Sequence, residues 1–168
     1  ADGEPSNWLI PADVIAQAAP LFEGVASYLD HPELFGFGWR GEPQVKNLIG
    51  TIQIPHWDAQ QDALAATLRL YDQDPNSPGA LVASILSQML ADRDAGSKVP
   101  SVGLSAVFWH DSELDEESGV RTTTRFKKVD SVDIVYSAGA GGYIRQALSA
   151  WGGSSPERNI SMPEDTND

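Results

Sequence analysis

The chain has 168 residues, of which 24 are Asp or Glu and 11 are Lys or Arg, so its formal net charge at pH 7 is −13. A surface this acidic repels phosphate backbones, which argues against direct nucleic-acid binding. The absence of cysteine excludes disulfides and thiolate metal sites. No apolar run approaches the roughly 20 residues of a membrane-spanning helix, and we expect no signal peptide.

The length and the 41% apolar fraction are typical of one globular domain. We assign residues 1–151 to that domain. Residues 152–168 have the polar composition of a flexible tail.

The first half of the chain predicts mainly strands. Residues 8–11 form a short extended anchor, and residues 11–19 carry a helical pattern that Pro20 ends. The strands that the pattern of branched and aromatic residues predicts are 21–29 and 46–55, with a glycine-rich loop over 35–44. Residues 64–71 fit either a helix or a strand, and we favour the strand.

The second half begins with the strongest helix, residues 77–93, which Ser77 can cap and whose leucine and methionine stripe we assign to the core. A buried strand over 99–109, an acidic turn over 111–119 and a second strand over 120–136 follow, the two strands being antiparallel. A glycine-rich link, 138–142, leads to a short helix over 143–151. The fold class is therefore α+β: a small barrel-like, mostly antiparallel sheet covered by helices.

Two kinds of site are disfavoured. The glycine-rich link lacks the G-x-G-x-x-G spacing of a dinucleotide site, and no P-loop motif occurs. His31, His56 and His110 do not have the spacing of metal ligands. We therefore expect neither a cofactor nor a metal.

Nucleophilic catalysis is the remaining option. Ser105 lies in the middle of the apolar run Val102-Gly103-Leu104-Ser105-Ala106-Val107-Phe108-Trp109. A serine nucleophile needs a general base and a partner that orients the base. His31, at a predicted strand end, and Asp133, in a predicted strand, supply those residue types. The alternative is that Ser105 is an ordinary strand serine and His31 a surface loop residue.

Three segments in this order resemble the prohead (capsid maturation) serine proteases of tailed bacteriophages, which belong to the same broad group as the herpesvirus assembly protease. They are Asp30-His31-Pro32-Glu33, Val102-Gly103-Leu104-Ser105-Ala106-Val107 and Asp130-Ser131-Val132-Asp133-Ile134-Val135. The resemblance covers residues 21–151. It implies a barrel-like sheet with surrounding helices and an endopeptidase that digests the scaffold and trims capsid proteins inside the immature prohead, in the host cytoplasm.

By position, the resemblance makes His31 the base and Ser105 the nucleophile. Asp133 stands where the herpesvirus enzymes have a second histidine, and Asp130 is a rival for that role. The herpesvirus arginine pair has no visible counterpart. The backbone amides of Gly139, Gly141 and Gly142 are the candidate oxyanion donors, and Arg145 lies further along the chain.

The implied partners are the scaffold protein and the major capsid protein as substrates. Self-cleavage and homo-oligomer formation stay open. Two other functions compete with the protease: a non-catalytic capsid- or scaffold-associated module with the same fold, and an unrelated acidic binding domain.

Overall fold

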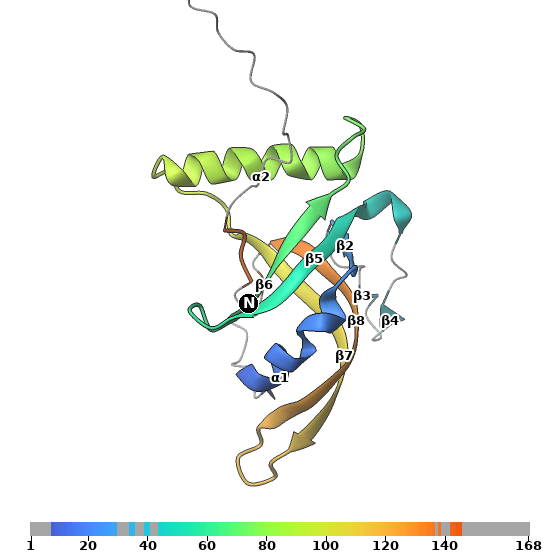
Figure 1. Cartoon of the computed structure of the whole chain (residues 1–168), viewed down its shortest axis with the longest axis vertical. Coiled ribbons are helices and arrows are strands. Elements are labelled where there is room, and N and C mark those ends of the chain that lie inside the picture. The colour runs from blue at the N-terminus through green and yellow to red at the C-terminus, as the bar shows by residue number, and fades with distance from the viewer. Residues whose placement is uncertain are drawn as a thin grey trace, which may run out of the picture.

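The computed structural model describes residues 8–29, 44–136, 138 and 142–145, together with the backbone of 34–35 and 39–40. The strands are β1 (Trp8–Leu9), β2 (Ala26–Tyr28), β3 (Leu34–Phe35), β4 (Trp39–Arg40), β5 (Leu48–Asp58), β6 (Ala63–Leu70), β7 (Val102–Leu114) and β8 (Arg121–Tyr136). The helices are α1 (Ala12–Ala18), α2 (Pro78–Asp94) and the 3-10 turns η1 (Ala19–Phe22) and η2 (Val45–Asn47). Figure 1 shows α2 across one end of the molecule and the turn of the β7–β8 hairpin at the other.

The β7–β8 hairpin dominates the first sheet, whose order is β1-β8-β7. Its register shifts at three bulges between its turn and Ser105. β1 pairs in parallel with β8, Trp8 opposite Arg121. The Trp8 indole Nε1–H donates to the buried Thr123 Oγ1 at 3.0 Å, so the N-terminal strand is fixed to the hairpin.

The second sheet, β2-β5-β6, is antiparallel. It is joined to β8 where Leu29 forms a parallel bridge with Ile134. Side chains of both sheets and of α1 share one core, built around Phe22, Ile52 and Val132. A second cluster links Ile49 and Ile134 to α2 through the buried Val82.

The α+β class is confirmed, but the barrel is wrong. Within the described ranges, the two three-stranded sheets are not closed into a barrel, and β3 and β4 form a separate two-stranded ribbon. β7 has β8 as its only strand partner among the described residues.

Several element bounds also differ from the predicted ones. Helix α1 ends at Ala18, before Pro20 as expected, but the 3-10 turn η1 carries the chain on to Phe22, because proline suits the first turn of a helical segment. The strand expected over 21–29 is therefore only β2. Residues 142–145 are not helical, so the helix expected over 143–151 does not begin where predicted. The rest of that helix lies outside the described residues.

Strand β7 runs beyond its predicted end at residue 109, because cross-strand ion pairs to β8 extend it into the acidic segment. Arg125 bonds Asp111 at 2.7 Å, and Lys127 also pairs with it. These cations, Lys127 first, hold the pKa of Asp111 below its ordinary value. β7 therefore continues to Leu114, and only the residues after it form the turn.

Helix α2 is confirmed, with Ser77 Oγ accepting from the Ala80 N–H at 3.1 Å. Its apolar stripe is only partly core, because Leu81 and Ile85 are 55% and 49% exposed. The helix rests on β5 and β6 by a narrow face. Gly79, at its first turn, lies directly against the Tyr71 carbonyl.

Candidate functional site

Ser105 and Asp133 face each other across the two long strands. They are direct register partners in the antiparallel β7–β8 pair. Residues in such positions point to the same face of the sheet, with Cβ atoms roughly 4.5–5.5 Å apart. Ser105 is half-buried, whereas Asp133 is fully buried. The fold therefore brings together two of the three predicted catalytic residues.

The Asp133 carboxylate is held from two directions. Its Oδ1 accepts from the Tyr28 backbone N–H at 3.2 Å, and its Oδ2 accepts from the Ser131 hydroxyl at 2.9 Å. Ser131 is itself 4% exposed. A buried carboxylate requires such donors, so β2 and β8 together orient this side chain. Next to Tyr28, the buried Ser27 hydroxyl has no hydrogen-bond partner among the described residues.

Asp130 has different surroundings. It is the extra residue of the bulge in β8 between the pairs Val107↔Ser131 and Phe108↔Val129. Its carboxylate accepts from the Trp109 indole N–H at 2.6 Å and pairs with Lys128 at 2.7 Å. These bonds hold Asp130 at the partly exposed surface, three residues from the partner of Ser105. Of the two aspartates, Asp133 is therefore the one that lies opposite Ser105.

The end of the glycine-rich link packs on the strand that carries Ser105. A Cβ on Gly103 would overlap the Gly142 carbonyl oxygen, and one on Gly142 would overlap the Leu104 carbonyl. Both positions therefore require glycine. Alternate residues of a strand share a face, so Gly142 lies on the face of β7 that Ser105 occupies.

Residues 142–145 are anchored at their far end. The Arg93 guanidinium of α2 donates to the Ile144 carbonyl at 3.1 Å and to the Arg145 carbonyl at 2.8 Å. The Arg145 side chain bonds Asp58, at the end of β5, at 2.9 Å. This hydrogen bond is the main reason that the pKa of Asp58 lies below its ordinary value, and burial opposes it.

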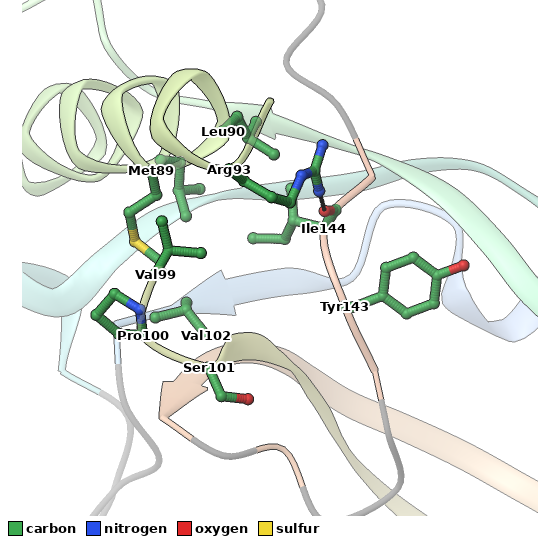
Figure 2. A pocket seen from close by; sticks show the side chains of 10 residues that line it. Met89, Leu90, Arg93, Val99, Pro100, Ser101, Val102, Tyr143 and Ile144 are labelled. Atoms are coloured by element: carbon green, nitrogen blue, oxygen red, sulfur yellow. Dashed lines mark hydrogen bonds between the residues drawn. The ribbon is translucent and has the colours of Figure 1, made fainter. Parts of the chain in front are cut away.

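An apolar pocket of about 250 Å³ lies between α2 and the 142–145 segment. Met89 and Leu90 of α2 line one side, Val99 and Val102 a second, and Ile144 a third (Figure 2). Figure 2 also shows the Arg93 guanidinium reaching the Ile144 carbonyl at the edge of this pocket.

The predicted base, His31, lies outside the described residues, as do Gly139 and Gly141. The other two histidines have local partners. His56 Nδ1 lies 3.0 Å from the Ile54 carbonyl, and His110 Nδ1 lies 3.1 Å from Thr123 Oγ1. Among the residues with described positions, no three His, Asp or Glu side chains gather as they would to hold a metal ion.

Sequence reasoning missed four residues around the site. Ser131 has a usable signal, since it precedes Asp133 by two residues on the same face of a strand. Tyr28, Arg93 and Asp58 act across long sequence separations, and no local pattern indicates them.

Comparisons with protein-family models, with curated proteins and with solved structures find no match for this chain. No helix in the described part of the chain is long and apolar enough to cross a membrane.

Proposed function

We propose that the chain is a serine endopeptidase in which Ser105 is the nucleophile, His31 the general base and Asp133 the residue that orients the base. The observation that carries this proposal is the direct cross-strand pairing of Ser105 with the buried Asp133. A half-buried serine hydroxyl and an oriented carboxylate are two of the three groups that a serine nucleophile needs, and an imidazole base is the third.

The chain path supports His31 as that imidazole. Leu29 bridges Ile134, the neighbour of Asp133, and the preceding Tyr28 N–H bonds the Asp133 carboxylate. His31 follows Leu29 by two residues, and two residues of chain span at most about 7 Å. The segment that carries the histidine therefore starts at the edge of the site.

The chemistry follows from these three groups. Neutral His31 takes the Ser105 hydroxyl proton as Oγ attacks the scissile carbonyl carbon, and Asp133 stabilises the imidazolium that forms. The imidazolium then protonates the leaving amine, and water hydrolyses the acyl-enzyme by the reverse proton path. Amides of Gly139, Gly141 and Gly142 are the proposed donors to the oxyanion.

The resemblance to prohead proteases supplies the proposed biological role. The substrates are then the internal scaffold and the major capsid protein, and the reaction takes place inside the immature prohead in the host cytoplasm. The order of the three motifs and the pairing of Ser105 with Asp133 both support this role. The competing role is a non-catalytic capsid- or scaffold-associated module with the same fold.

A fluorophosphonate probe tests the proposal, because it labels only an activated serine. We expect one label per chain on the parent, none on Ser105→Ala or His31→Ala, and full labelling on the control Ser101→Ala, which alters an exposed serine of the same region. Replacing the Ser105 hydroxyl should change stability by about 1 kcal/mol or less. A folded parent that takes up no label and cleaves no scaffold peptide would favour the non-catalytic module.

A further inference from the structure

We infer that Arg93 is a positioning residue of this active site: it holds residues 142–145 in place beside Ser105 and thereby fixes the backbone on which oxyanion binding depends. This inference rests on the proposed function. It assigns a role to a residue of helix α2 that is none of the three proposed catalytic residues.

The contacts define the role. Two N–H groups of one guanidinium reach two successive carbonyls, at 3.1 and 2.8 Å. The Asp94 carboxylate accepts from the same guanidinium at 3.1 and 3.2 Å. Asp94 thus orients the Arg93 guanidinium. The guanidinium in turn donates to main-chain carbonyls of the 142–145 segment.

The link to Ser105 runs through Gly142. The backbone of Gly142 is in contact with Gly103 and Leu104, and Gly103 precedes Ser105 by two residues on the same face of β7. The two carbonyls that Arg93 bonds, those of Ile144 and Arg145, follow Gly142 by only two and three residues. A shift of those carbonyls is therefore transmitted along a very short stretch of main chain to the position next to the nucleophile.

A second anchor acts on the same segment from β5, through the Arg145–Asp58 ion pair. It fixes a long side chain, whereas Arg93 bonds the main chain directly. Arg93 should therefore affect the alignment of the segment more than Asp58 does. Lysine cannot make both hydrogen bonds in the same geometry, because its ammonium is a compact point charge, whereas the guanidinium is planar with its donors in a fixed arrangement.

The experiment compares Arg93→Gln and Arg93→Lys with the control Arg125→Gln. Arg125 also bonds an aspartate from an exposed position, but it does so in the distal part of the hairpin. Fluorophosphonate titration of reactive serines gives the concentration of active protein, and steady-state cleavage of a scaffold-derived peptide gives kcat and KM per active site. Hydrogen–deuterium exchange measures the protection of peptides that contain residues 142–145.

We expect Arg93→Gln to lower kcat about 10- to 100-fold, since small misplacements of catalytic groups cost about that much, while KM changes less than about threefold. Arg93→Lys should recover only part of kcat, and Arg125→Gln should match the parent. Amide exchange in residues 142–145 should rise in Arg93→Gln, rise less in Arg93→Lys, and stay at the parent's level in Arg125→Gln.

Three results would overturn the role, and they can be distinguished from one another. If the parent is labelled and active but kcat per titrated site in Arg93→Gln stays within twofold, Arg93 is merely structural and the proposed function survives. If the parent is neither labelled nor active, the proposed function fails, and this role fails with it. If amide exchange in residues 142–145 is unchanged in Arg93→Gln, Arg93 does not anchor that segment, whatever the activity of the variant.

Discussion

Replacing Ser131 by alanine removes one of the two described donors to the buried Asp133 carboxylate, and its cost can be worked from the structure. The Ser131 hydroxyl donates to Asp133 Oδ2 at 2.9 Å, with both residues buried. Hydrogen bonds to charged groups contribute about 1.5–3 kcal/mol. Ser131→Ala should therefore lower the free energy of unfolding by about 1.5–3 kcal/mol. For a chain of this size, that is a fall in Tm of roughly 3–12 °C.

Ser118→Ala is the matched control. Ser118 also donates its hydroxyl to an aspartate, Asp115, at 2.6 Å, but in the exposed hairpin turn. Exposed substitutions of this kind change stability by about 0.5 kcal/mol or less. Urea unfolding at pH 7 followed by tryptophan fluorescence measures both variants. If the two serines cost the same, the Asp133 carboxylate is not held through Ser131, and the account of how the site is oriented fails.

Three other predictions concern the site and its surroundings. Asp133→Asn should lower the single-turnover rate of peptide cleavage about 10²–10⁴-fold, whereas Asp130→Asn should cost less than tenfold; equal, small effects would show that neither aspartate orients the base. Gly103→Ala should lower the free energy of unfolding by roughly 1–3 kcal/mol, since a methyl group there overlaps main chain, and an unchanged urea midpoint would contradict the close packing. Arg145 lowers the pKa of Asp58 in the folded state, so the ion pair stabilises the fold above the unfolded pKa of about 3.9 and the effect is lost as pH falls through the lower, folded pKa. Urea midpoints of the parent and of Asp58→Asn should therefore differ at pH 7 and converge below pH ~3, and a gap that widens in acid would refute this sign.

The sequence pattern correctly predicted the helices and strands that are determined by residues close together in the chain. Helix α2 has a serine cap and a proline at its first position, and β5, β6 and the hairpin strands are rich in branched and aromatic residues. Caps and strand-forming runs each involve only a few consecutive residues, so they can be recognised in the sequence. The exposure of Leu81 and Ile85 was not predictable in this way, because it depends on how narrow a face the helix buries.

The choice between the two aspartates shows where sequence reasoning ends. Near its turn, the hairpin pairs Leu114 with Arg121, and that register, continued without a shift, would place Asp130 opposite Ser105. The three bulges each shift β8 by one residue and bring Asp133 there instead. Bulge positions leave no periodic signal in a sequence, so the pattern alone could not decide between the two aspartates, and Asp133 was preferred over its rival Asp130 only by its position in the resemblance.

The parallel pairing of β1 with β8 has a consequence for how the domain folds. Trp8 pairs with Arg121 and bonds Thr123, so the first described strand meets a partner more than a hundred residues later. Contacts of such separation carry a high loop-closure entropy and form late, whereas the β7–β8 hairpin closes over a short turn. During synthesis, Trp8 has no partner until β8 has left the ribosome. We therefore expect the hairpin to form first and the N-terminal strand to dock last.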